Sequence, residues 1–461
     1  MNSQATILKL TCPDAVGLLA RLTGFVAARG GNLLEVHQFT EPVSRWFFAR
    51  LAVDSATLPG GLDGFRRDFE PVARELGAEG VGSAEDFSGR DHDRVGVGGA
   101  RERLCGGAGG REGRGALVRV HLMGVSGSGM SGMALWYRSA GHFVSGCDRE
   151  PHDTSALERA GIEVFAGHDP AHSEGADLLV HTAAIAASHP EIERARSSGR
   201  RVLRRSEALA ELCAGLSVLA VAGAHGKTTT TAMTGWALQQ AGLDPTVLTG
   251  GVLRAWGSGF RPGGRIGVVE ADEYDRTFLR LPHRHAAVTS FDAEHLECYG
   301  SIENLRSAFQ VFLELGEPGG GVVVPVECPE LACWAARIGR RVLHAGPGGD
   351  FDCRSISASG WGERFSLGGE EGFLPMPGLE NLRNASTCIA LLELAGVPRL
   401  VAMRALESYP GVARRMERIG FWRGGIVISD YAHHPREIEA TLSAVRRAVP
   451  GRIVAVFEPH L

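Results

Sequence analysis

Three observations predict a multidomain α/β chain: its length, its alternation of strand and helix patterns, and two glycine-rich turns that follow buried strands. The 461 residues are 44% hydrophobic and 22% charged, which is typical of globular domains. We expect an N-terminal ferredoxin-type domain, a Rossmann-like domain, a central phosphate-loop α/β domain and a partial Rossmann-like third domain. The expected bounds are 1–80, 117–214, 215–410 and 411–461, with a disordered linker at 81–116.

Residues 1–80 carry the periodicities of a small α/β unit. Apolar spacing predicts helices at 15–30 and 61–77, and strand patterns occur at 5–12, 32–42 and 45–53. The segment that follows, 81–116, is rich in Gly, Arg and Asp and lacks periodicity. Such a composition does not bury a core, so it predicts a flexible linker.

From residue 117 strands alternate with helices, a pattern typical of parallel sheets. Buried-strand patterns occur at 116–124, 216–223, 266–271 and 285–290. Near the end, strands are expected at 425–432 and 452–459, on either side of a helix at 435–448. A third domain that stops at Leu461 is small for an independent α/β domain, so we expect it to be incomplete and turnover to be weak.

Charge and cysteine usage exclude several classes of protein. The formal net charge of −5 gives no electrostatic reason to expect a nucleic acid partner. No run approaches the roughly 20 apolar residues that span a bilayer, and the N-terminus lacks the features of a secretory signal. We therefore expect a cytoplasmic protein without membrane contact. The nine cysteines include no CxxC pair, so buried free thiols are expected rather than a zinc site.

The strongest motif is AVAGAHGKTTTT at 220–231, a buried strand that runs into a glycine turn and a helix. Backbone N–H groups in such a turn bind phosphate oxygens, the lysine neutralises the β- and γ-phosphates, and the first threonine binds Mg²⁺. Val221 takes the place of the first glycine of the longer motif. The predicted ATP-binding loop comprises Gly223, Ala224, His225, Gly226, Lys227, Thr228 and Thr229.

Two acidic segments follow later strands. Glu270 ends the strand of VVEADEYD at the edge where ligands lie in open α/β sheets, and its carboxylate suits Mg²⁺. A solvated acidic loop is the alternative for this segment. In TSFDAEHLE, His295 follows a strand and stands near Asp292 and Glu294, which favours a metal or phosphate role over a structural one. Thr228, Glu270 and His295 are the predicted metal ligands, and Lys227, Glu270 and His295 the predicted catalytic residues.

These segments together resemble the Mur ligase family over residues 117–461. The resemblance also rests on HLMGVSGSGMSGMA at 121–134, SGCD at 145–148, PGLENLRNA at 377–385, GVARRME at 411–417 and DYAHHP at 430–435. It implies three domains that bind, in order, a UDP-sugar, ATP and the incoming amino acid. The implied UDP-sugar residues are Gly124, Gly127, Ser128, Gly129, Met130, Ser131 and Asp148.

The resemblance also implies residues around the ATP. Asn381 and Asn384 correspond to a segment near the adenine, although Glu380 replaces the usual histidine, and Arg414 and Arg415 correspond to a segment that reaches the phosphates. On the amino-acid side it implies Tyr431, His433 and His434. Each has a simpler alternative: a plain helix N-terminus for the asparagines, a solvated face for the arginines and a helix cap for His434. The glycine turn at 124–131 alone also fits a dinucleotide fingerprint.

The implied reaction is the ATP-dependent joining of L-alanine to the carboxylate of UDP-N-acetylmuramate through an acyl phosphate. ATP and Mg²⁺ are the implied cofactors. No lysine follows Lys227, so the carbamoylated lysine of some family members has no counterpart here. The alternatives are a murein peptide recycling ligase of the same fold and a non-catalytic nucleotide-binding remnant.

The front segment resembles ACT domains, most of all the one that precedes the catalytic domain of formyltetrahydrofolate deformylases. The matching residues are CPDAVGLLARLTGFVAARGGNLLEVHQFTEP at 12–42 and RWFFARL at 45–51. This resemblance implies amino-acid binding around Asp14 and Gly17, or pairing into a homodimer. A structural role and a fusion without regulatory meaning are the alternatives.

Overall fold

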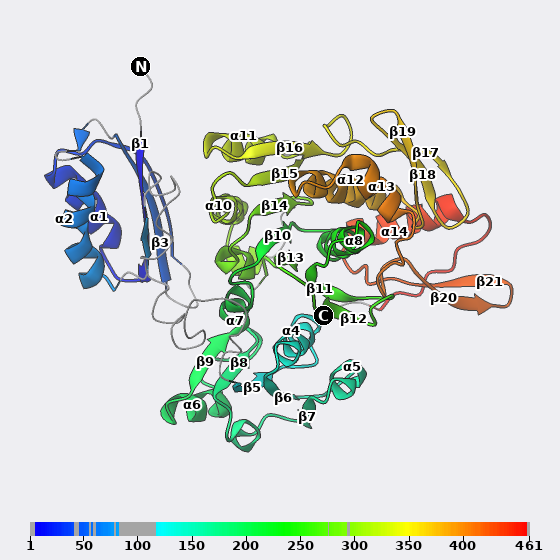
Figure 1. The fold of residues 1–461 in the computed structure, drawn as a ribbon, viewed down its shortest axis with the longest axis horizontal. Helices are drawn as coiled ribbons and strands as arrows, with labels where there is room; N and C mark the ends of the chain where they lie inside the picture. The colour runs from blue at the N-terminus through cyan, green and yellow to red at the C-terminus, as the bar shows by residue number, and fades with distance from the viewer. Residues whose placement is uncertain are drawn as a thin grey trace. The chain divides into compact units, whose positions relative to one another are not determined.

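The computed structural model describes residues 5–40, 46–54, 57–58, 61–77, 80–82, 117–274, 276–292 and 296–458. The chain divides into two compact units, Met1–Ala116 and Leu117–Leu461 (Figure 1). Most of the linker predicted at 81–116 lies outside the described residues, but Val81 and Gly82 belong to a strand. Its start was therefore placed too early, because a three-residue edge strand leaves no readable periodicity.

The first unit is a four-stranded antiparallel sheet with two helices on one face (Figure 1). The strand order β2-β3-β1-β4 is that of the ferredoxin-type βαββαβ arrangement. Leu10, Leu22 and Leu51 form its buried centre, and the Phe25 ring packs edge-on against Phe65 and Phe69. The elements are β1 (Ala5–Pro13), α1 (Leu18–Ala28), β2 (Leu33–Thr40), β3 (Trp46–Asp54), α2 (Gly61–Glu75) and β4 (Gly80–Gly82).

The second unit begins with a five-stranded parallel sheet in the order β7-β6-β5-β8-β9. Its strand order reverses between β5 and β8, and ligands bind at such a reversal, outside the carboxyl ends of the strands. The strands are β5 (Arg119–Met123), β6 (Phe143–Asp148), β7 (Glu163–Ala166), β8 (Leu178–His181) and β9 (Arg201–Arg204). The helices are α4 (Ser128–Ser139), α5 (Ser155–Arg159), η3 (Pro170–Ser173), α6 (Pro190–Ser197) and α7 (Arg205–Leu212).

A seven-stranded sheet in the order β12-β11-β13-β10-β14-β15-β16 follows, parallel except for β12. Its strands are β10 (Ser217–Ala222), β11 (Thr246–Leu253), β12 (Ser258–Arg261), β13 (Ile266–Glu270), β14 (His285–Val288), β15 (Gly321–Pro325) and β16 (Arg341–Ala345). Its helices are α8 (Lys227–Gln240), η4 (Thr277–Arg280), α9 (Leu296–Tyr299), α10 (Ile302–Glu314), α11 (Pro329–Arg337), α12 (Leu379–Leu394) and α13 (Arg399–Leu406). A small antiparallel sheet of β17 (Arg354–Ala358), β18 (Glu363–Leu367) and β19 (Glu370–Leu374) adjoins α13.

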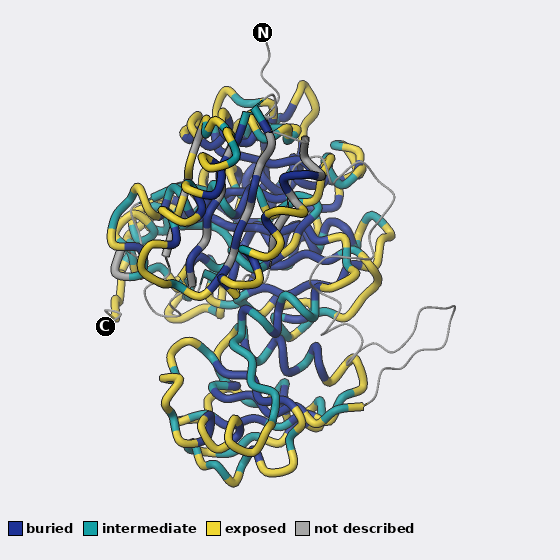
Figure 2. Tube along the Cα trace, turned by 90° about the vertical axis from the view of Figure 1, so that its left-hand side faces the viewer, coloured by how far each residue is buried: buried dark blue, intermediate teal, exposed yellow. Residues whose placement is uncertain are grey.

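Helix α8 lies between the central sheet and two further helices. It packs on β10, β11 and β13, and α12 and α13 cover its other side (Figure 1). Ten of its 14 residues are buried, so it is a core helix rather than an amphipathic surface helix. Figure 2 shows buried residues, in dark blue, along the strands and inner helices.

The third part of the second unit differs from the prediction. Its described residues form an antiparallel hairpin, β20 (Glu417–Trp422) and β21 (Gly425–Ser429), and the helix α14 (Pro435–Ala448). The strand predicted at 452–459 is wrong for residues 452–458, where Val454 and Val456 are 71% and 97% exposed. A strand needs a neighbour for its backbone N–H and C=O groups, and these residues pair with none of the described strands. The parallel sheet of a Rossmann-like third domain is therefore not formed within the described residues.

Membrane-spanning helices were not expected. Among the described residues, none of the helices combines the length and the hydrophobicity needed to cross a bilayer.

Candidate active site

The predicted phosphate loop joins β10 to α8 with two glycines in left-handed conformations. Gly223 has φ 127° and Gly226 has φ 80°. A Cβ atom on Gly226 would stand 2.2 Å from Asn384 Oδ1, and one on Gly223 would stand 2.4 Å from Thr289 Oγ1. Both positions therefore require glycine for conformation and for space.

Lys227, the first residue of α8, folds its ammonium group back over this loop. Its Nζ donates to Gly223 O at 2.8 Å and Ala224 O at 3.1 Å, and it pairs with Glu273 Oε1 at 2.7 Å. Although burial opposes it, the attraction of Glu273 and Asp272 raises the pKa of Lys227. Burial raises the pKa of Glu273 to about 7 against the attraction of the lysine. The loop thus holds a charged ammonium beside a buried carboxylate.

Thr228 and Glu270, two predicted metal ligands, meet directly. Thr228 Oγ1 donates to Glu270 Oε1 at 3.0 Å. The other carboxylate oxygen accepts from Gly250 N at 2.6 Å and from Thr249 Oγ1 at 3.2 Å. These donors fix the carboxylate beside the hydroxyl, and such a set of hard oxygen atoms fits Mg²⁺. The third predicted ligand, His295, lies outside the described residues.

His225 connects the loop to the third part of the unit. Its Nδ1 lies 3.3 Å from Glu437 Oε1, and its Nε2 lies 3.7 Å from Asp292 Oδ2. Asp292 also pairs with Arg436. Burial opposes ionisation of Glu437, but bonds from His225 and from the His433 N–H lower its pKa to about 2. The N-terminus of α14 is therefore anchored to the phosphate loop.

The predicted residues on the amino-acid side lie together beside this anchor. The guanidinium carbons of Arg414 and Arg415 lie 4.7 and 5.4 Å from the centre of the Tyr431 ring, at cation–π distance. The Tyr431 and His433 rings meet edge to face at 5.4 Å. His434 is the N-cap residue of α14, as the helix-cap alternative expects, and its ring lies 5.4 Å from the His225 ring.

Asn381 and Asn384 lie on the first turns of α12, against α8. Thr230 Oγ1 is 3.4 Å from Asn384 Oδ1, and Asn384 Nδ2 is 3.5 Å from Asn381 Oδ1. Asn381 donates from Nδ2 to Pro377 O at 2.7 Å. Asn384 therefore packs beneath the phosphate loop, while Asn381 stabilises the start of its own helix.

The glycine turn after β5 has a different set of partners. Gly124 has φ 78°, and Asp148 Oδ2 accepts a bond from Ser126 N at 3.0 Å, so this aspartate orders the turn itself. Ser131 Oγ donates to Ser128 O at 3.0 Å. Met130 is buried in the core. Gly127 is the N-cap residue of α4 and makes no side-chain cap bond, and the N-terminus of such a helix favours anions.

Arg205 is a site residue that the sequence analysis missed. Its Nη2 donates to Asp272 Oδ2 at 3.1 Å and to Thr277 Oγ1 at 3.2 Å. A Cβ atom on Gly129 would stand 2.6 Å from its Nη1. Despite burial, Arg205 and Lys227 lower the pKa of Asp272. Arg205 thus bridges the glycine turn and the acidic segment, and only the fold joins residues 67 positions apart.

Three family models match this unit. The model of the Mur ligase family catalytic domain matches residues 119–216, that of the Mur ligase middle domain matches 221–392, and that of the Mur ligase glutamate ligase domain matches 414–460.

Individual proteins are similar over the same range. UDP-N-acetylmuramate–L-alanine ligase of Rhizobium etli is 39% identical over 363 residues, which covers 75% of this chain and 77% of the relative. The corresponding ligase of Allorhizobium ampelinum is 40% identical, with 74% and 76% covered. The solved UDP-N-acetylmuramate-alanine ligase of Thermotoga maritima has a TM-score of 0.64 at 30% identity, with 72% and 78% covered. A murein peptide ligase of Psychrobacter arcticus has a TM-score of 0.59 at 27% identity, with 71% and 76% covered.

Proposed function

Because this chain belongs to the Mur ligase family, we infer that it joins an amino acid to a UDP-linked sugar acid in an ATP-dependent reaction. It is a ligase of the UDP-N-acetylmuramate–L-alanine type, which acts in peptidoglycan precursor synthesis. The observation that carries this function is the phosphate loop itself, where Lys227 lies over the loop carbonyls and Thr228 contacts Glu270.

The proposed reaction brings two anionic groups together, the sugar carboxylate and the γ-phosphate of ATP. The sugar carboxylate attacks the γ-phosphorus of ATP, the bond to the β,γ-bridging oxygen breaks, and ADP leaves an acyl phosphate behind. The amine of L-alanine then attacks the acyl carbon and displaces inorganic phosphate, with loss of a proton from nitrogen. The reacting groups are anionic, so catalysis consists of positioning and of charge stabilisation.

In this proposal Lys227 and the N–H groups of the loop bind the β- and γ-phosphates. The ammonium exchanges Glu273 for phosphate oxygens, and Glu273, with a pKa of about 7, can take up a proton as it loses its partner. Thr228 and Glu270 would hold Mg²⁺, together with His295. The metal supplies neutralising charge to the phosphates.

The neighbouring segments supply the other substrates' contacts. The glycine turn from Gly124 to Ser131, with Asp148, would bind the UDP-sugar, and Asn384 would support the nucleotide. Arg414 and Arg415 would approach the phosphates. Tyr431, His433 and His434 would line the amino-acid side. The anchor between His225 and Glu437 supports this assignment, because it brings these residues to the phosphate loop.

A direct test is phosphate release by the full chain with ATP, Mg²⁺ and UDP-N-acetylmuramate. We expect turnover with L-alanine and little with L-alanyl-γ-D-glutamyl-meso-diaminopimelate as the amine. Preference for the tripeptide would assign the chain to murein peptide recycling instead. No release with either amine, together with unmeasurable ATP binding, would indicate a non-catalytic remnant.

For the first unit we propose an ACT-like role, the pairing of two chains. The strand order β2-β3-β1-β4 leaves β2 at an edge, where Leu34 and Val36 are 47% and 37% exposed. Gly17, with φ 87°, follows Asp14 in the turn where an amino acid would bind. Sedimentation of the full chain should reveal a dimer that Leu34→Glu dissociates. Leu400→Glu, at an equally exposed leucine of α13, should leave the dimer intact.

We also propose that the protein works in the cytoplasm.

A further inference from the structure

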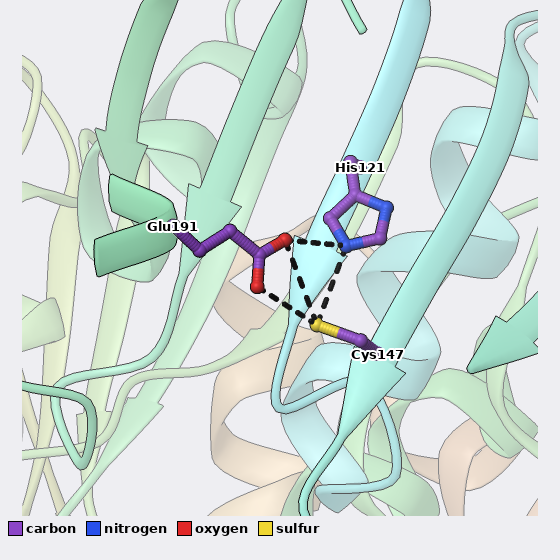
Figure 3. A group of neighbouring side chains, drawn as sticks. All are labelled: His121, Cys147 and Glu191. Carbon is purple, nitrogen blue, oxygen red and sulfur yellow. Dashed lines mark hydrogen bonds and ion pairs between the residues drawn. The ribbon is translucent and has the colours of Figure 1, made fainter. Parts of the chain in front are cut away.

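Three side chains with metal-binding atoms converge beside the first parallel sheet, next to the glycine turn that follows β5. His121 comes from β5, Cys147 from β6 and Glu191 from the first turn of α6, and Figure 3 shows them pointing toward one another. Each of the three is fully buried, at 0% exposure. The proposed reaction uses none of them.

The distances fit a single ion at the centre. His121 Nε2 lies 3.2 Å from Glu191 Oε1 and 3.3 Å from Cys147 Sγ (Figure 3). Sγ lies 3.9 Å from the same carboxylate oxygen and 3.6 Å from Oε2. A tetrahedral zinc ion with N, O and S ligands at about 2.0–2.3 Å separates those atoms by about 3.3–3.6 Å. The group is therefore already close to the spacing that the metal requires.

Hydrogen bonds alone do not account for all three contacts. Nε2 of an imidazole presents one in-plane hydrogen or one lone pair, so it bonds one neighbour at a time. Here Glu191 Oε1 and Cys147 Sγ both approach this nitrogen. A metal ion placed along the lone pair of His121 Nε2 would bind the nitrogen, the sulfur and the carboxylate at the same time.

Charge points the same way. A fully buried carboxylate is stabilised by a compensating cation, and its neighbour His121 is charged only when it is protonated. If Cys147 releases its thiol proton to solvent, a dication balances one thiolate and one carboxylate with His121 neutral. The cluster then carries no net charge, which suits its complete burial.

Two further side chains complete the surroundings. His121 Nδ1 lies 2.9 Å from Ser145 Oγ, a contact that holds the ring with Nε2 toward the cluster. His168, which is half-buried, places Nδ1 3.0 Å from Cys147 Sγ on the side that leads to solvent. His168 therefore adjoins the cluster through the sulfur alone, since only His121, Cys147 and Glu191 have ligand atoms that all lie within 4.8 Å of one another.

We propose that His121, Cys147 and Glu191 form a structural zinc site, with a water molecule as the fourth ligand. A mixed set of imidazole, thiolate and carboxylate in tetrahedral spacing favours Zn²⁺ over the oxygen-preferring Mg²⁺. The site would also fix the glycine turn. Cys147 O accepts from Gly124 N at 2.7 Å and from Val125 N at 3.1 Å, so the metal would hold β6 against that turn.

The test uses the metal-stripped full chain titrated with Co²⁺, which gives a thiolate-to-metal charge-transfer band when sulfur is a ligand. We expect one equivalent to produce the band, Zn²⁺ to displace it, and Zn²⁺ to raise the thermal midpoint. Cys147→Ser should abolish the band, and Glu191→Gln should weaken Co²⁺ binding by more than about 100-fold.

Matched controls separate this site from others. Cys213→Ser removes another buried thiol of the same unit, and Glu270→Gln alters the proposed magnesium site, which lacks sulfur; both should keep the band. The proposal is overturned if the unaltered chain shows no band, or if the band persists in Cys147→Ser. These outcomes are independent of ligase activity.

Discussion

Thr228 Oγ1 donates a 3.0 Å hydrogen bond to Glu270 Oε1, although 42 residues separate them. Bonds from Gly250 N and Thr249 Oγ1 hold the other carboxylate oxygen, so the pair is set before any ligand arrives. This relationship defines where the proposed metal would lie and gives the first prediction.

Glu270→Gln should lower kcat/KM by on the order of 100-fold, because an amide keeps the shape of the side chain and removes its charge. The Mg²⁺ concentration for half-maximal rate should rise as well. Phosphate-release assays over a Mg²⁺ series measure both. Glu330→Gln on α11 is the control and should behave as the unaltered chain; equal Mg²⁺ dependence in the two variants would contradict the assignment.

Gly226→Ala should weaken ATP binding more than tenfold, because its Cβ would meet Asn384 Oδ1 at 2.2 Å. Gly242 offers a close control, since its φ of 79° matches the 80° of Gly226 while its Cβ would meet nothing within 4 Å. Gly242→Ala should lower stability by about 1–2 kcal/mol and leave ATP affinity unchanged. Calorimetric titration and thermal unfolding of both variants check this, and similar ATP affinities in the two would refute it.

Glu437 should make the protein less stable in acid. Its pKa falls from 4.5 to about 2 on folding, because bonds from His225 and the His433 N–H outweigh burial. Its contribution is therefore present above pH 4.5 and is lost as the pH falls toward 2. The loss amounts to roughly 3 kcal/mol at most.

Urea unfolding from pH 6 to pH 3 measures this effect. Glu437→Gln should flatten the decline in the free energy of unfolding, since the titrating group is gone. Glu439→Gln, an exposed neighbour on the same helix, should retain the full decline. Parallel curves for all three proteins would rule out the anchor as a source of acid sensitivity.

Arg205→Ala should lower kcat about tenfold and raise the KM of both ATP and the UDP-sugar, because it removes the bridge between Asp272 and the glycine turn. Arg205 acts here as a positioning residue, so Arg205→Lys should retain part of the activity that Arg205→Ala loses. Lysine keeps the positive charge but lacks the two-pronged guanidinium that bonds two partners at once. Arg280→Ala, which removes a bond to Glu207 on the same helix α7, is the control. A change in stability with unaltered KM values would assign Arg205 a purely structural role.

Local patterns predicted much of this fold. The helix expected at 435–448 has those bounds in the structure, and the loop from Gly223 to Thr229 joins a buried strand to a helix as its spacing indicates. The helix expected from residue 15 begins at Leu18, because the left-handed Gly17 precedes it. Glycine turns and helical periodicity are properties of neighbouring residues, and the sequence displays them directly.

Relationships between distant residues were not accessible in this way. No pattern near Arg205 in the sequence indicates that it bonds Asp272. The lack of CxxC pairs likewise gave no sign that Cys147 belongs to a possible metal site, because its partners His121 and Glu191 come from other elements. The strand expected at 452–459 was wrong over its described residues, 452–458, for a related reason. The alternation of apolar residues indicates which side of a strand would be buried. It does not show whether a neighbouring strand is present to form hydrogen bonds with it.

The burial of most of α8 limits how this enzyme can respond to its substrates. A helix enclosed by the sheet, α12 and α13 cannot shift without opening a core, so the triphosphate meets a rigid platform. The hairpin β20–β21 is far more exposed, with Ile419, Phe421 and Trp422 each at least 60% accessible. Adjustment to bound reactants is therefore expected in the hairpin, because the contact of His225 with Glu437 holds the N-terminus of α14 at the phosphate loop.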